Sequence, residues 1–134
     1  MITLRRQFTP LPQDLEFLEE HGLPWETIVD GSQWFLIHEF PTHEGYNHPL
    51  VTAAIRIETG YPQAELNMVY FFPALARKDG KPIGATQTVQ QIDGKAFQRW
   101  SRHRTGQNPW KAGRDYLGTH VLLIEDWLER EFEK

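Results

Sequence analysis

Hydrophobic and polar positions alternate with a period of two through much of the stretch from Trp25 to Phe72. Such alternation is typical of half-buried β-strands. It predicts four strands, over residues 26–29, 33–40, 50–58 and 66–72. The turn signals Asp30-Gly31 and Gly60-Tyr61-Pro62 separate strands of this meander. Both faces of the second strand are apolar, so we expect a helix to cover one face of the sheet and a partner to cover the other.

Helical spacing appears near both ends of the chain. Leu15 and Leu18 lie three apart and are followed by Gly22, which predicts a short helix over residues 15–21. The last 20 residues predict a long helix, because apolar residues recur there at spacings of four, three and four. These residues are Leu117, Val121, Ile124 and Leu128. Asp115 is a candidate N-cap of this helix.

The predicted order is a helix, a four-strand meander, an irregular crossing segment and a long helix. Residues 84–92 fit a further extended segment, and Asp93-Gly94 is another turn signal. An antiparallel sheet with helices on one face is the compact solution, so we expect an α+β fold. With 134 residues, 40% of them hydrophobic, the chain is expected to form one domain over residues 1–134.

Basic residues are concentrated in one segment. No acidic residue lies between Asp93 and Asp115, and six of the 14 basic residues of the chain lie there. We call residues 95–114 the cationic segment; it also contains Trp100 and Trp110. The net charge of −4 argues against a general nucleic-acid-binding protein, so a nucleic-acid partner is not expected.

The chain contains no cysteine. Disulfides, cysteine-based zinc sites and a thioester-forming nucleophile are therefore excluded. The sequence also contains no apolar run of the roughly 18–20 residues that a membrane helix needs, and its first residues do not resemble a secretory signal. We expect a cytoplasmic protein without a membrane partner and without a cofactor.

Several short motifs resemble the ubiquitin-conjugating enzyme superfamily. Gly60-Tyr61-Pro62 followed by residues 66–73 (LNMVYFFP) looks like its third and fourth strands. More specifically, the chain resembles the bacterial branch known as prokaryotic family E, over about residues 12–132. The motifs that carry this likeness are Trp100-Ser101-Arg102-His103, Asn108-Pro109-Trp110, Gly113-Arg114-Asp115-Tyr116-Leu117 and Thr119-His120.

The resemblance implies a UBC-like fold, with a four-stranded antiparallel meander sheet packed by an N-terminal helix and a long C-terminal helix. It also implies a role in bacterial ubiquitin-like conjugation. The expected partners are a ubiquitin-like protein, an activating-enzyme-like adenylating protein and a possible deconjugating protease of the same system. Classical members carry a His-Pro-Asn motif and a catalytic cysteine, but here the fourth strand ends in Phe72-Pro73-Ala74-Leu75, with neither.

A hydroxyl group is the nearest substitute for the missing thiol. Ser101 lies close to where the classical cysteine would fall, and His103 or His120 could take its proton. Asp115 could then orient the imidazole, as the third member of a triad does. The product would be an oxyester. Alternatively, Ser101 is a turn residue and His120 is a hydrogen-bonded structural residue.

Five residues are candidates for contact with the partner. Because the cationic segment lacks acidic neighbours, its arginines favour an anionic ligand, an acidic surface or a C-terminal carboxylate. We expect Trp110 to pack on the final helix. The five candidates are Arg99, Arg102, Arg104, Trp110 and Arg114.

Two other functions remain open. A non-catalytic adaptor that binds a ubiquitin-like protein fits a chain without cysteine. A metal-dependent enzyme is the other alternative, since His38, His43 and His48 lie close together in the sequence, with Glu39 and Glu44 between them. Their spacing does not match the helical His-Glu-x-x-His pattern.

Overall fold

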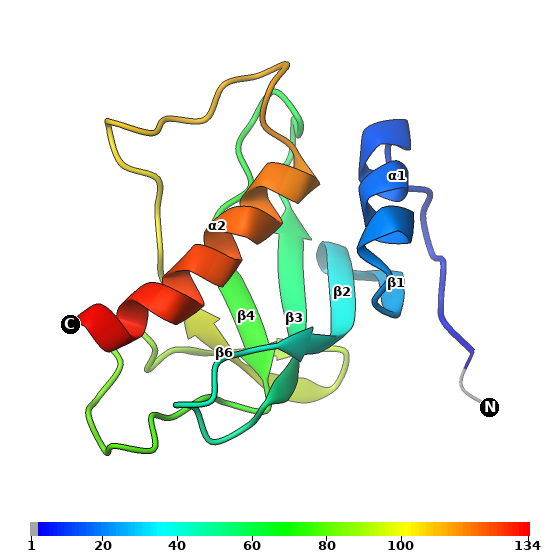
Figure 1. Cartoon of the computed structure of the whole chain (residues 1–134). Helices are drawn as coiled ribbons and strands as arrows, with labels where there is room; N and C mark the ends of the chain where they lie inside the picture. Colours follow the sequence, from blue (N-terminus) through cyan, green and yellow to red (C-terminus); the bar gives the residue numbers. More distant parts are fainter. Residues whose placement is uncertain (1–2) are drawn as a thin grey trace.

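Six antiparallel strands form one curled sheet, and two helices cover one of its faces (Figure 1). The computed structural model describes residues 3–134. The elements are α1 (Pro12–His21), β1 (Trp25–Asp30), β2 (Ser32–Pro41), β3 (Leu50–Ile57), β4 (Val69–Phe72), β5 (Val89–Ile92), β6 (Lys95–Trp100), α2 (Leu117–Arg130) and the 3₁₀ helix η1 (Glu131–Glu133). Among these residues, no helix has the length and apolar character needed to cross a membrane.

The α+β class and the antiparallel meander are confirmed, but the sheet has six strands instead of the expected four. The strand order is β1-β2-β3-β4-β6-β5, so the β5–β6 hairpin extends the meander beyond β4. Asp93 and Gly94 form the hairpin turn, both with positive φ (53° and 75°). This pairing of positive φ values fits the tight turn that an Asp-Gly sequence favours.

A buried glutamine interrupts the hydrophobic pattern of β6, so the sequence does not predict this strand. Gln98 occupies a buried position of the strand, where it accepts a hydrogen bond from the Leu75 amide (2.9 Å) and donates one to the Leu75 carbonyl (3.1 Å). Its side chain is thereby satisfied by backbone groups. A polar residue with this role breaks the apolar alternation by which strands are recognised.

The helix face of the sheet carries the larger core. Leu117, Val121, Ile124 and Leu128 of α2 are all buried there, as their spacing predicts. In Figure 1, α2 (orange to red) runs obliquely across the strands. The helix begins after Tyr116, whose amide donates to Thr119 Oγ1 (3.0 Å), so Asp115 is not its N-cap residue.

The opposite face is covered by the sheet itself, and not by a partner as expected. Ile28 of β1 and Ile92 of β5 belong to one buried cluster with Trp34 and Phe97, although β1 and β5 are the two ends of the strand order. The sheet must therefore curl until its two edges approach. Polar contacts tie the edges together, since the Asp93 amide donates to the Asp30 carboxylate (2.8 Å).

One buried polar contact joins three separate parts of the chain. The Tyr61 hydroxyl donates to the Asp14 carboxylate of α1 (2.8 Å) and accepts from the Leu117 amide at the start of α2 (3.0 Å). Asp14 is fully buried. Burial raises the pKa of this carboxyl above its ordinary value, while the hydrogen bonds from Tyr61 and Leu117 lower it. This contact fixes where α2 begins.

Candidate functional site

The cationic segment runs along β6 and then crosses as irregular chain to the start of α2 (Figure 1). Its arginines do have acidic neighbours in space. Arg102 lies 3.4 Å from Glu131, and Arg104 and Arg114 lie 3.6 and 3.1 Å from Asp115. The absence of acids along the sequence is thus partly compensated by acids that the fold brings in, and the free cationic character is smaller than the sequence implies.

Ser101 directly follows β6 and is half-buried. Its amide donates to the Ala85 carbonyl (3.1 Å), and its Oγ accepts a hydrogen bond from Arg99 Nε (3.1 Å). Within residues 3–134, no imidazole or carboxylate is hydrogen-bonded to this hydroxyl. A serine in this environment has no base in contact that could take its proton.

His103 is exposed, and its Nδ1 lies 2.9 Å from Asn67 Oδ1. An amide oxygen is an acceptor, so Nδ1 carries a proton here. The imidazole is therefore held by the segment that precedes β4, and not by Ser101.

His120 lies in the first turns of α2 and is buried against the core. Its Nε2 donates to the Met68 carbonyl (2.8 Å), and its ring meets the edge of Trp127. Burial lowers the pKa of His120 to about 4, so the ring is neutral at pH 7. Its Nδ1 is buried and has no hydrogen-bond partner among the described residues. These contacts are those of a structural histidine.

Asp115 contacts cations instead of an imidazole. It is buried, and it accepts hydrogen bonds from the Lys111 amide (2.8 Å) and from Arg114 (3.1 Å). Burial works to raise the pKa of this carboxyl, but these hydrogen bonds and the charge of Arg104 outweigh it and leave the pKa below its ordinary value. Asp115 is thus an ionised anchor for the arginines around it.

A pocket of about 490 Å³ opens between the cationic segment and the outer side of α2. Arg104 forms part of its wall, with a side chain that is 6% exposed and a guanidinium 5.0 Å from the centre of the Trp110 ring. Arg104 Nε is buried without a hydrogen-bond partner among the described residues. Leu122 of α2 lies at the same pocket and is 64% exposed. Further lining residues are Asn108, Arg114, Asp115, Thr119, Leu123, Asp126 and Arg130.

Trp110 packs against Arg104 in the wall of this pocket. Its indole Nε1 donates to the Pro62 carbonyl (3.0 Å), and its ring lies 6.2 Å from that of Tyr61. The turn before β4 therefore holds Trp110, which in turn holds the guanidinium of Arg104.

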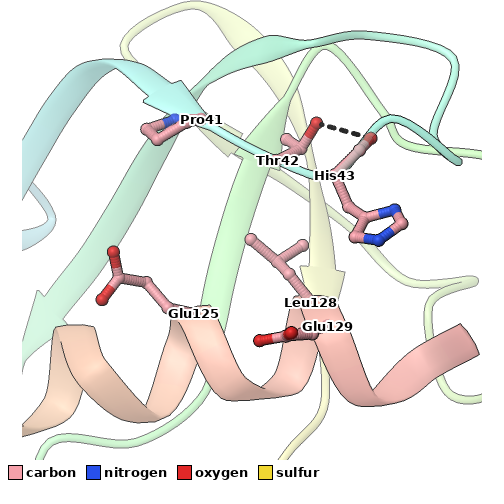
Figure 2. A pocket seen from close by; sticks show the side chains of 6 residues that line it. All are labelled: Pro41, Thr42, His43, Glu125, Leu128 and Glu129. Carbon is pink, nitrogen blue, oxygen red and sulfur yellow. Dashed lines mark hydrogen bonds between the residues drawn. The ribbon is translucent and has the colours of Figure 1, made fainter. Parts of the chain in front are cut away.

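The three histidines of the metal-enzyme alternative are not brought together. His38 contacts Glu26 and Thr52 on the far face of the sheet, whereas the His43 ring stacks on Phe132 (4.5 Å). Figure 2 shows the pocket of about 280 Å³ near His43, with Glu125 and Glu129 on α2 and the imidazole to one side. Over residues 3–134 no group of three metal-binding side chains is found, so the predicted histidine cluster is wrong.

The sequence interpretation overlooked the contribution of α2 to the pocket. Leu122 lies off the apolar stripe of this helix, on the side that faces solvent. A large apolar residue at such a position is the signal that could have identified it.

Comparison with known proteins gives one family. The model of prokaryotic E2 family E matches residues 11–131. No curated protein and no solved structure matches the chain.

Proposed function

Since the chain belongs to prokaryotic E2 family E, we propose that it acts in a ubiquitin-like conjugation pathway by binding the C-terminal tail of the ubiquitin-like protein. The binding site is the pocket between the cationic segment and α2. In this proposal the protein is an adaptor that presents the tail to other components, including the adenylating protein of the pathway.

The unsatisfied Nε of Arg104 is the observation that carries this proposal. A buried donor without an acceptor costs about 1–3 kcal/mol, and a ligand oxygen would recover this cost once the pocket wall moves to admit it to Nε. Carboxylate and peptide carbonyl oxygens are suitable acceptors, and both occur at a protein C-terminus. Arg114, with a side chain 54% exposed, adds positive charge at the same pocket, and Leu122 offers an apolar contact.

The four candidate catalytic residues favour binding over transfer. Ser101 contacts Arg99 instead of a base, and His103 contacts Asn67. His120 is buried and neutral, and Asp115 is engaged by arginines. An oxyester mechanism through Ser101 and His103 would require these side chains to rearrange.

A binding titration tests the proposal. The purified chain is titrated with the ubiquitin-like protein of the same conjugation system, by calorimetry. We expect Arg104→Gln to weaken binding at least about tenfold, since charge-assisted hydrogen bonds contribute about 1.5–3 kcal/mol. Arg114→Gln alters an exposed side chain and serves as a second variant if Arg104→Gln unfolds. Arg56→Gln, which removes the same charge on β3, is the matched control.

Unchanged binding by both pocket variants would refute the tail site. A separate experiment addresses transfer. The chain is incubated with the adenylated ubiquitin-like protein and examined for a hydroxylamine-sensitive adduct. An adduct in the wild type that is lost in Ser101→Ala would establish oxyester transfer in place of the adaptor role.

A further inference from the structure

Three side chains on neighbouring strands form a continuous hydrogen-bonded relay away from α2. His38 of β2 lies between Glu26 of β1 and Thr52 of β3. His38 Nε2 is 2.8 Å from Glu26 Oε1, and His38 Nδ1 is 3.0 Å from Thr52 Oγ1. The strand register pairs Glu26 with Leu36, and Leu36 with Ala54, so the relay lies on the sheet face opposite the helices.

The negative charge of Glu26 determines which of the three side chains donate hydrogen bonds and which accept them. Arg5 donates to Glu26 through Nε (2.7 Å), Nη2 (3.2 Å) and its amide (2.9 Å). The hydrogen bonds from Arg5 lower the pKa of Glu26 to about 2, against the effect of burial. An ionised carboxylate is an acceptor, so His38 Nε2 carries the proton. In the neutral ring Nδ1 is then an acceptor, and the Thr52 hydroxyl donates to it.

This polarity is that of a catalytic triad. A hydroxyl donates to an imidazole nitrogen, and the other ring nitrogen donates to a buried carboxylate. The Glu26 side chain is 8% exposed and the His38 side chain 28%, so the base is accessible while its orienting group is not. Ser101 has no comparable contact.

A pocket of about 580 Å³ lies against His38. The pairing of β2 with β3 is irregular between Ile37 and Phe40, and Glu39 has a positive φ of 56°. In a regular strand, residues 38 and 39 point to opposite faces. The irregularity brings both of them to this pocket, and such bulges commonly re-aim side chains beside active sites. Leu4, Pro24 and Glu26 complete the lining.

We propose that Thr52, His38 and Glu26 form an acyl-transfer site for small, uncharged carboxylic esters. Thr52 is the nucleophile, His38 the general base, and Glu26 the positioning residue. Leu4 and Pro24 supply apolar contact for the acyl chain, and the exposed carboxylate of Glu39 disfavours anionic substrates. The site does not depend on the proposed tail-binding pocket, which lies at the other face of the sheet.

The reaction proceeds in two steps, acylation of Thr52 and hydrolysis of the acyl ester. Thr52 Oγ attacks the ester carbonyl carbon while its proton passes to His38 Nδ1, and Glu26 stabilises the imidazolium. The ester C–O bond breaks, the alcohol departs with the proton from His38, and an acyl ester of Thr52 remains. Water then attacks the acyl carbon and gives a proton to His38, which returns it to Thr52 Oγ as the carboxylic acid leaves.

The experiment uses the full chain and p-nitrophenyl butyrate. Release of p-nitrophenol is followed in a spectrophotometer, and the butyryl adduct is sought by intact-mass measurement and peptide mapping. We expect turnover above the buffer rate and an adduct on Thr52. Thr52→Val and His38→Gln are each expected to lower the rate at least about 100-fold, the typical contribution of a nucleophile–base pair.

Matched variants separate chemistry from folding. Thr52→Ser keeps the hydroxyl and is expected to retain adduct formation, while Thr59→Val makes the same change at an exposed residue and is expected to leave the rate unchanged. Circular dichroism establishes that each variant is folded. The proposal is overturned if the wild type does not exceed the buffer rate, if folded Thr52→Val keeps its rate, or if the adduct maps elsewhere.

Discussion

Replacing Tyr61 by phenylalanine tests the buried link between α1 and α2. The substitution removes the hydroxyl that donates to Asp14 (2.8 Å) and accepts from the Leu117 amide (3.0 Å). Hydrogen bonds to charged groups contribute about 1.5–3 kcal/mol, so we expect the free energy of unfolding at pH 7 to fall by about 2–3 kcal/mol. For a chain of this size, the melting temperature should fall by about 4 °C for each kcal/mol.

The penalty is expected to depend on pH. Burial places the folded-state pKa of Asp14 above its ordinary value of 3.8. The folded state is therefore destabilised as the pH rises above 3.8, because the carboxyl ionises less readily there than in the unfolded chain. The hydrogen bond from Tyr61 limits this cost, because it lowers the pKa. Without the hydroxyl the ionised form is less stable still. Tyr61→Phe should therefore lose more stability at pH 7 than at pH 4.5.

Urea unfolding at both pH values measures the difference, with the wild type as the reference at each. Tyr46→Phe is the matched control, because the Tyr46 hydroxyl donates to the uncharged Leu128 carbonyl (2.6 Å). Its loss of about 1–2 kcal/mol should be the same at both pH values. If the Tyr61→Phe penalty were equally independent of pH, the assignment of Asp14 as its ionised partner would be wrong.

Three further predictions concern packing and acid stability. A Cβ added at Gly45 would overlap the Phe132 ring, so Gly45→Ala should lower the free energy of unfolding in urea by about 1–3 kcal/mol. Gly106→Ala, with open space around it, should change this free energy by less than about 0.5 kcal/mol, and equal effects of the two substitutions would contradict this packing. Because burial holds the pKa of His120 near 4, below its ordinary 6.5, up to about 3 kcal/mol should be lost as the pH falls from 6.5 to 4, and a His120→Gln variant that keeps this slope would exclude His120 as its source. Glu26, whose pKa is lowered from 4.5 to about 2 by Arg5, should contribute a separate loss of about 3 kcal/mol as the pH falls from 4.5 to 2, which Glu26→Gln should abolish; a wild-type-like profile of that variant would disprove it.

The parts of the fold that could be predicted from the sequence are those with one continuous apolar pattern. The stripe of α2 reflects burial against the larger core, and β1 to β4 place apolar residues in buried clusters on both faces of the sheet, so both patterns can be recognised in the sequence. β5 does not show such a pattern, because Val89, Gln90 and Gln91 are exposed at the edge of the sheet. β6 is obscured by Gln98, whose polar side chain is buried but satisfied by backbone groups.

The candidate site was predicted less completely, because its contacts depend on distances that sequence neighbours do not determine. Ser101 and His103 are two residues apart, yet each is hydrogen-bonded to a different, distant part of the chain. The acids near the arginines are likewise supplied by folding, as with Glu131 beside Arg102. The relay through His38 is hidden for the same reason, since it requires the strand register and the irregularity before Phe40.

Anion binding and base catalysis make opposite electrostatic demands, which explains why the two proposed sites lie apart. A cationic pocket attracts a tail carboxylate, but the same positive charge disfavours protonation of a nearby imidazole; the charge of Arg104 helps to lower the pKa of His120. A general base needs the reverse, a carboxylate that stabilises its protonated form, which Glu26 provides for His38. In a chain without cysteine, any hydroxyl nucleophile depends on such a base. Chemistry is therefore expected on the carboxylate-backed face of the sheet, and tail binding beside the arginines near α2.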